Sequence, residues 1–230
     1  FFFGTDSSGL DVFSRTIAAA RIVLGIGIMA SVLVVLLACV AGSMLGFFEH
    51  RRSAVGVAAR LALRLIDLLQ SIPLTVAALV IVVIFGTNPI VLGAGIAVIL
   101  SPAQARLVRT EVLRVRREGY IDAARMAGRS ETNIAFTRVL PASLWPLLEN
   151  WPMLFANAIM IVAALGFLGV GIQPPTAEWG AMISSGSADA SAGRWWPVVF
   201  PSLALIFSVV TMNLLRRLVV GWLPEHLRGR

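Results

Sequence analysis

The sequence predicts an all-α fold, a polytopic bundle of transmembrane helices, and two observations carry this prediction. Of the 230 residues, 58% are hydrophobic and only 13% are charged, against about a quarter charged in an average soluble domain. Four stretches, 22–48, 68–105, 150–177 and 195–215, contain no Asp, Glu, Lys, Arg or His. A membrane-spanning helix needs about 20 such residues.

Five spans are expected from these stretches. The stretch 68–105 is too long for one helix, and Gly86-Thr87-Asn88-Pro89 is a turn signal that divides it. The expected spans lie at about 22–47, 66–86, 89–107, 151–171 and 196–216. In the first span, Ala38, Gly42 and Gly46 recur at four-residue steps and predict a helix-packing face. Pro73 and Pro102 lie inside spans and are expected to kink them.

The arginines predict the orientation of the spans. All 19 basic residues are Arg. Apart from Arg15, Arg21 and Arg194, they lie in three segments: from His50-Arg51-Arg52 to Arg64, from Arg106 to Arg138, and from Arg216 to the end of the tail. By the positive-inside rule that side, with the C-terminus, is cytoplasmic. Residues 1–15 then form an external N-terminal segment, and a sixth span is expected before Phe1. One transmembrane domain is expected at 16–223, with a cytoplasmic loop at about 108–148, an external loop at about 172–195 and a cytoplasmic tail at 224–230.

Several function classes are disfavoured by what the spans contain. An ion-coupled carrier needs ionisable groups at bilayer depth, and the nearest such residue, Asp67, lies one turn from Arg64 at the cytoplasmic end of its span, where it is expected to be paired. Neither catalytic residues nor a metal site are expected, since His50 and His226 are the only histidines and Cys39 is the only cysteine. No nucleic-acid partner is expected, because bilayer-length apolar stretches separate the arginines. A channel or ion-driven carrier and an intramembrane enzyme remain competing classes.

The cytoplasmic loop contains a helix, a glycine turn and a second helix. Tyr120, Ala123, Ala124 and Ala127 form a small-residue face that Gly128 ends as a helix C-cap. Ser130 then caps a new helix with Glu131 in its first turn, and Pro141 is expected at its end. Such an arrangement is typical of a lever inserted into a groove on a partner; a solvated basic loop is the alternative.

Three motifs resemble those of a known family. Residues 120–128, YIDAARMAG, followed by Ile134 and by Leu140-Pro141, resemble the EAA coupling motif of ABC importer permeases. Residues 4–11, GTDSSGLD, look like the GTDxxGRD segment of the dipeptide and oligopeptide branch. Residues 167–175, FLGVGIQPP, with EWG at 178–180, look like that branch's FLGLGxxPPxxxWG segment.

The resemblance implies the type I permease fold of ABC importers and the C-type subunit of the dipeptide, oligopeptide and nickel family. It implies a homologous B-type permease, two ATPase subunits that bind ATP and Mg, and an external binding protein that delivers substrate, in a bacterial inner (cytoplasmic) membrane. No cofactor is expected on this chain, which has no G-x-x-x-x-G-K-[ST] motif for ATP. The residues implied to dock onto the ATPase are Tyr120, Asp122, Ala123, Ala124, Gly128, Ile134, Leu140 and Pro141.

The outer residues implied to dock the binding protein are Thr5, Asp6, Asp11, Pro174, Pro175, Trp179 and Gly180. The loop 173–194 that holds four of them is polar and bounded by tryptophans, as an external loop at the membrane interface would be; a passive loop is the alternative. Asp122 replaces the usual Glu, Leu10 replaces the usual Arg, and the tail lacks the usual acidic ending. Small peptides are the expected substrate, with a nickel chelate or another small solute as the alternative.

Overall fold

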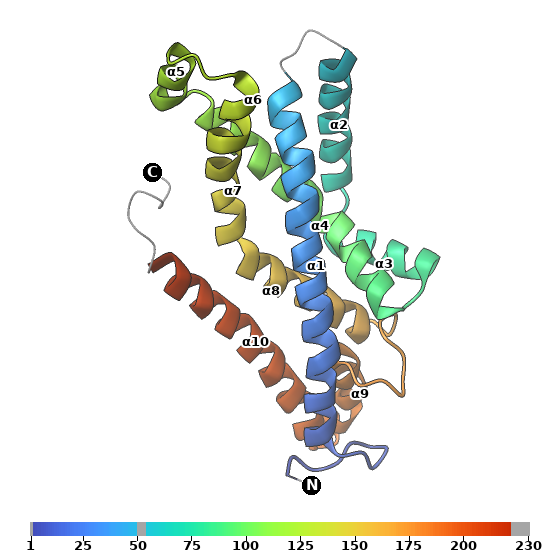
Figure 1. The fold of residues 1–230 in the computed structure, drawn as a ribbon. Helices are drawn as coiled ribbons and strands as arrows, with labels where there is room; N and C mark the ends of the chain where they lie inside the picture. Colours follow the sequence, from blue (N-terminus) through green and yellow to red (C-terminus); the bar gives the residue numbers. More distant parts are fainter. Residues whose placement is uncertain (1, 50–53, 222–230) are drawn as a thin grey trace. The chain divides into compact units, whose positions relative to one another are not determined.

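A computed structural model describes residues 2–49 and 54–221. The expectations for residues 50–53 and for the tail at 224–230 lie outside the described residues. The described chain is helical almost throughout and follows the order shown in Figure 1. Its helices are α1 (Val12–Phe48), α2 (Ala54–Gln70), α3 (Leu74–Phe85), α4 (Pro89–Val115), α5 (Gly119–Met126), α6 (Glu131–Ile134), η1 (Ala135–Val139), α7 (Leu140–Glu149), α8 (Trp151–Phe167), α9 (Trp179–Ser191) and α10 (Trp196–Gly221).

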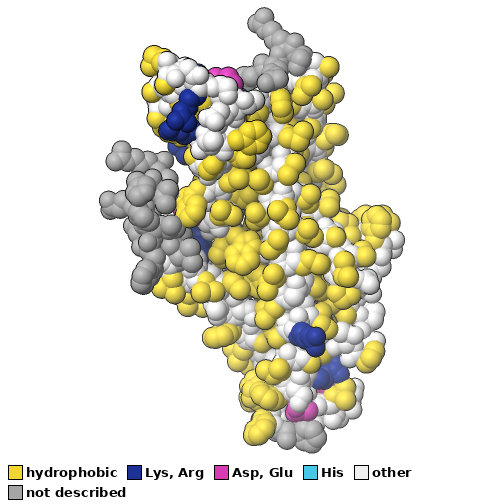
Figure 2. Space-filling model, viewed as in Figure 1, with side chains coloured by type: hydrophobic (Ala, Val, Ile, Leu, Met, Phe, Trp, Pro, Cys, Tyr) yellow, Lys and Arg dark blue, Asp and Glu magenta, His cyan; other side chains and the backbone are white. Residues whose placement is uncertain are grey.

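Up to five spans, the number that the sequence predicts, can be counted if each bent helix pair is taken as one span. Three helices are each long and apolar enough to cross a membrane, namely α1, α4 and residues Trp196–Leu218 of α10. Two helix pairs pass the same test when each is taken as one span across a short break: α2 with α3, and Glu131–Glu149 with α8. Hydrophobic side chains cover most of the face in Figure 2, which suits contact with lipid.

The boundaries of the spans differ from those expected. Helix α1 begins at Val12, well before residue 22, because Asp11 accepts a hydrogen bond from the Ser14 backbone N–H at 2.9 Å and caps the helix ahead of the apolar run. The span at 66–86 is two helices, because Pro73 has no backbone N–H and disfavours helical geometry in the residue before it. The Ser71 hydroxyl donates to the Leu68 carbonyl at 2.7 Å at this break. Pro102 lies within α4.

The described chain divides into two units, each with its own core. The first comprises residues 2–32, 73–99 and 152–221, and the second comprises 33–49, 54–72 and 100–151. In the first unit, Phe155 and Ile159 of α8 are fully buried, and a Cβ built on Gly27 would lie 2.5 Å from Ile159. In the second, Val108 and Val112 of α4 are fully buried.

The stripe Ala38, Gly42 and Gly46 lies on the buried side of α1 in the second unit. A Cβ on Gly42 would lie 2.5 Å from the Ala105 carbonyl oxygen, and one on Gly46 would lie 2.7 Å from Val112. Both distances are shorter than a carbon atom tolerates, so only glycine permits α1 and α4 to come this close.

One expectation about a helix end was wrong, and one segment expected as a loop contains a helix. The helix that begins after Ser130 does not end at Pro141 but continues through η1, a π-helical segment, into α7. Proline is tolerated there because Pro141 lies in the first turn of α7, after a segment whose hydrogen bonds run from residue i to i+5. The external loop at 172–195 is not all loop, because Glu178 caps α9 within it.

Candidate coupling segment and outer surface

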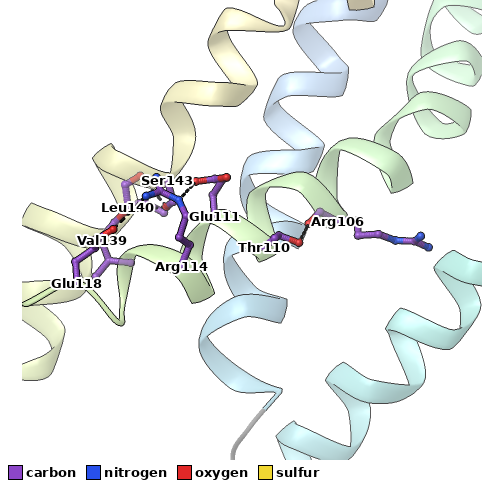
Figure 3. Close-up of polar contacts among 8 residues, drawn as sticks. All are labelled: Arg106, Thr110, Glu111, Arg114, Glu118, Val139, Leu140 and Ser143. Atoms are coloured by element: carbon purple, nitrogen blue, oxygen red, sulfur yellow. Dashed lines mark hydrogen bonds and ion pairs between the residues drawn. The ribbon is translucent and has the colours of Figure 1, made fainter. Parts of the chain in front are cut away.

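The C-terminal end of α4 continues toward α5 through ion pairs on consecutive turns. Arg114 donates to Glu111 at 2.8 Å and to Glu118 at 3.2 Å, and Figure 3 shows its side chain between the two carboxylates. This arrangement stabilises the last turn of α4, where the chain turns into α5.

The turn between α5 and α6 has the two caps that the sequence predicts. Gly128 has φ +78°, in the left-handed region, and the Arg129 N–H donates to the Ala124 carbonyl at 3.2 Å across it. On the other side of the turn, the Asn133 N–H donates to the Ser130 hydroxyl at 3.3 Å. Glycine reaches this φ without the steric cost that a side chain would add.

Arg125 joins the two helices across that turn. Its guanidinium donates to Asp122 at 2.7 Å and to Glu131 at 2.7 Å. The hydrogen bond from Arg125 lowers the pKa of Glu131 below its ordinary value. The hydrogen bonds to Glu131 and then to Asp122 raise the pKa of Arg125. One cation therefore pairs with a carboxylate on each helix and links α5 to α6 across the turn.

The eight residues implied to dock an ATPase divide into two groups. Asp122, Ala123, Gly128 and Pro141 are exposed, as is Tyr120, whose side chain is 44% exposed. Ala124 and Ile134 are buried and Leu140 is half-buried, so these residues support the turn from within. The exposed group can meet a partner directly, and the buried group can act only by shaping it.

Sequence reasoning missed two apolar side chains on the same segment. Met126 is 84% exposed and Phe136 is 71% exposed. Large apolar side chains in a polar, Arg-rich loop were the available signal, because such residues on an exposed surface commonly mark a contact with a partner.

The coupling segment is fastened to the end of α1 by arginines of α4 and its continuation. Arg109 pairs with Glu49 and donates a further hydrogen bond to it at 2.8 Å. Arg116 donates to the Gly46 carbonyl at 3.3 Å and lies over the Phe47 ring, 5.7 Å from its centre. Asp67 is paired, as expected, but its partner is Arg106 of α4, which reaches across to α2.

The acidic residues of the N-terminal segment accept hydrogen bonds from within that segment. The Asp6 carboxylate accepts from the backbone N–H groups of Ser8 and Leu10, at 3.0 and 2.9 Å. Thr5 forms an isolated bridge with Asp11, and its carbonyl accepts from the Trp196 indole at 2.9 Å. The implied docking residues Thr5, Asp6 and Asp11 thus shape this segment, and all three are half-buried.

The segment 172–195 separates its implied docking residues by burial. Pro174 and Pro175 are exposed. Trp179 is 1% exposed and donates to the Thr16 carbonyl at 3.0 Å, and Gly180 is buried with its Cα against Ala163. Because α8 and the start of α1 already cover Trp179 and Gly180, these two residues present no surface of their own in this unit.

Glu178 caps the start of α9 with a buried carboxylate. Its carboxylate is 0% exposed and accepts from the Gly180 and Ala181 N–H groups, both at 2.8 Å. Burial raises the pKa of Glu178, and the two backbone donors oppose that shift. A Cβ on Gly166 would lie 1.7 Å from this carboxylate, so α8 must carry glycine there. Among the described residues, no group of three or more His, Cys, Asp or Glu could hold a metal ion.

Comparison with known proteins identifies relatives along nearly the whole chain. A sequence profile described as binding-protein-dependent transport system inner membrane component matches residues 38–229. The di/tripeptide transport system permease protein DppC of Pseudomonas aeruginosa is 37% identical over 215 residues, covering 94% of this chain and 69% of that protein. The glutathione transport system permease protein GsiD of Pectobacterium atrosepticum is 34% identical over 212 residues, covering 92% and 68%.

Solved structures show the same fold. A chain of the MetNI methionine ABC transporter in an inward-facing conformation has a TM-score of 0.70 at 16% identity, over 90% of this chain and 95% of that chain. A chain of an amino acid ABC transporter crystallised with histidines has a TM-score of 0.69 at 17% identity, over 91% and 97%. The expected helical fold is confirmed by these similarities.

Proposed function

The chain belongs to the family of binding-protein-dependent transport system inner membrane components, and from this premise we propose that it is a permease subunit of an ATP-driven importer of small peptides. Substrate would reach it from an external binding protein, and a homologous second permease would complete the pathway. Two separate ATPase subunits would hold ATP and Mg and hydrolyse the nucleotide. The chain itself would carry no catalytic residue.

The α5–α6 turn carries the proposal for coupling to an ATPase. It presents Asp122, Ala123 and Gly128 to solvent, and Arg125 pairs with a carboxylate on each helix. Small side chains allow close approach of a partner. The ion pairs of Arg125 link the two helices, and small residues form the exposed surface of the turn. This arrangement suits the transmission of a partner's movement into α4 and α7.

The proposed substrate class rests on the relatives. The names of similar proteins from Pseudomonas aeruginosa and Haemophilus influenzae specify di/tripeptide and dipeptide transport, and that from Pectobacterium atrosepticum specifies glutathione, itself a tripeptide. We accordingly propose short peptides. We also propose a multi-pass location in a bacterial inner membrane with the C-terminus in the cytoplasm, which the distribution of Arg supports.

The test of coupling is Gly128→Asn in the assembled transporter reconstituted into vesicles. Asparagine tolerates φ +78° but adds a side chain to the docking face. We expect ATP-dependent peptide uptake to fall by about tenfold or more, equivalent to ~1.4 kcal/mol, while the chain still inserts and assembles. Gly193→Asn is the matched control, because Gly193 also has positive φ and open space around it but lies on the outer side; it should keep full uptake.

Two outcomes would contradict the proposal. Full uptake by Gly128→Asn would remove the coupling role of this turn. Uptake that continues in vesicles without the ATPase subunits would indicate a channel or an ion-driven carrier. For the substrate, excess unlabelled dipeptide should compete with a labelled dipeptide, whereas free amino acids should not.

A further inference from the structure

A cavity in the second unit lies beside the proposed coupling turn and shares Arg125, Ile134 and Leu140 with it. It has a volume of about 560 Å³ and is formed by the C-terminal part of α1 and by the α6–η1–α7 segment. Its walls are mostly apolar: Val40, Met44 and Phe47 on one side face Phe136 and Leu140 on the other. This volume lies within the range of about 300–1,000 Å³ that is typical of small-molecule sites.

The lining of the cavity carries two arginines, Arg116 and Arg125, and one carboxylate, Glu131. Arg125, on the rim, is paired with Asp122 and Glu131. Arg116 donates to the Gly46 carbonyl and lies over the Phe47 ring. Its charge contributes to the lowered pKa of Glu131, but no salt bridge joins it to a carboxylate of the described residues. A guanidinium has five N–H donors, so Arg116 keeps donors that can bind an anion.

A second polar group in the lining has unused hydrogen-bonding capacity. The Ser43 hydroxyl oxygen lies on the cavity wall, is buried, and has no hydrogen-bond partner among the described residues. A buried hydroxyl without a partner costs free energy that a bound ligand could recover. The cavity thus combines apolar walls, more arginines than carboxylates and one hydroxyl without a partner among the described residues.

The position of the cavity along α1 favours one kind of occupant. It adjoins residues 39–48, at the end of α1 that the Arg distribution assigns to the cytoplasmic side. Lipid headgroups lie at this level, and the cytoplasmic leaflet of bacterial and other membranes carries anionic lipids that basic pockets between helices can bind. A free anion would leave the apolar walls unused, and a neutral lipid would leave Arg116 unused.

We propose that this cavity binds an anionic phospholipid, with an acyl chain between α1 and η1 and the phosphate on Arg116. The bound lipid would fill the space beside the segment that turns toward the ATPase. The site depends on the membrane location of the family but not on which substrate the transporter carries, so its test uses no transport readout.

Cys39 provides a reporter within the site. It is the only cysteine of the chain and it lines the cavity. The assembled transporter is placed in nanodiscs of phosphatidylcholine, with or without phosphatidylglycerol, and the rate at which N-ethylmaleimide alkylates Cys39 is followed by mass spectrometry of this chain. We expect phosphatidylglycerol to slow alkylation, since the lipid covers the thiol. Inorganic phosphate added to phosphatidylcholine discs should not slow it.

Variants of the rim separate site binding from general surface charge. Loss of one cation should weaken protection by about fivefold in Arg116→Gln, and Arg116→Lys should keep most of it. Arg117→Gln, which removes the neighbouring charge outside the lining, should behave as the wild type. Equal alkylation rates in the two lipid compositions, as a protein helix filling the cavity would give, would overturn the proposal. Equal loss in Arg116→Gln and Arg117→Gln, or protection by phosphate alone, would also overturn it.

Discussion

At Gly42 a missing side chain decides how closely two helices pack. A Cβ there would lie 2.5 Å from a backbone oxygen of α4, which cannot move without moving the helix. We predict that Gly42→Ala destabilises the protein by about 1–3 kcal/mol, as overpacking of a close contact does. Thermal unfolding of the detergent-solubilised transporter measures the loss.

Gly25, also in α1, is the control for this prediction. It has nothing within 4 Å of its would-be Cβ, so Gly25→Ala should be neutral or should stabilise the helix by up to about 1 kcal/mol, because alanine has the higher helix propensity. Equal melting temperatures for the two variants would contradict the packing role of Gly42.

Single residues also show where sequence reasoning reaches its limit. The small-residue stripe that contains Gly42 is visible as a four-residue period, because helical periodicity is local. The stripe does not say which helix it meets, and only the fold identifies α4. Asp67 makes the same point: the nearest cation in sequence is Arg64, whereas the ion pair forms with Arg106, 39 residues away. Long side chains pair with groups that the fold brings near, and the linear sequence does not show which groups these are.

Among the elements, α5 and α6 are joined by the Arg125–Glu131 ion pair, which is lost when Glu131 is protonated. The pKa of Glu131 is lowered by Arg125 from its ordinary value of 4.5. A carboxylate with a lowered pKa in the folded state stabilises that state above 4.5 and loses this contribution as the pH falls through the lowered pKa. We predict that amide hydrogen exchange in α5 accelerates below pH 4.5 relative to that of Glu131→Gln, which should lack this acid step.

The size of this effect should be modest, because both side chains are partly in water and exposed ion pairs are weak. The two proteins are compared at each pH, so that the intrinsic pH dependence of exchange cancels. If the wild type and Glu131→Gln kept a constant ratio of exchange rates across the acid range, the clamp between the two helices would contribute nothing.

Local chemistry explains which elements the sequence predicted. The end of α5 at Gly128 and the start of α6 at Ser130 depend on caps within a few residues, so they could be predicted. The continuation past Pro141 could not, because the π-helical hydrogen bonds of η1 and the early position of the proline in α7 compensate for the missing N–H. Helix α9 was missed because its cap is a buried glutamate rather than one of the usual short capping residues.

For the whole molecule, the apolar runs predicted where membrane-spanning helices lie, because this follows from transfer of side chains between water and lipid. The orientation derived from the arginines stays a prediction. The sequence could not show which of the implied docking residues are buried and which are exposed. Trp179 belongs to a motif implied to dock a binding protein, yet tertiary packing places it against Thr16. Exposed Pro174 lies in the same motif, and nothing in the sequence separates the two.

That difference predicts two distinct phenotypes in the assembled transporter. Pro174→Arg should leave thermal stability unchanged and weaken stimulation of ATP hydrolysis by the binding protein, with a docking loss of about 1 kcal/mol, or about fivefold in affinity. Trp179→Phe should lower thermal stability, because it removes the hydrogen bond to Thr16. The measurements are ATPase titrations with binding protein and melting curves. Normal stimulation of Pro174→Arg would rule out docking at this proline.

The π-helical segment η1 also determines where the chain can change its length. Each hydrogen bond of a π-helix connects residues five apart instead of four, so each hydrogen-bonded loop of η1 contains one residue more than in an α-helix. A single-residue deletion within Ala135–Val139 would let an ordinary α-helical ladder form and would leave the faces of α6 and α7 in register. The same deletion inside α7 would rotate everything after it by about 100°. Among homologues that differ in length by one residue, the gap is expected at η1.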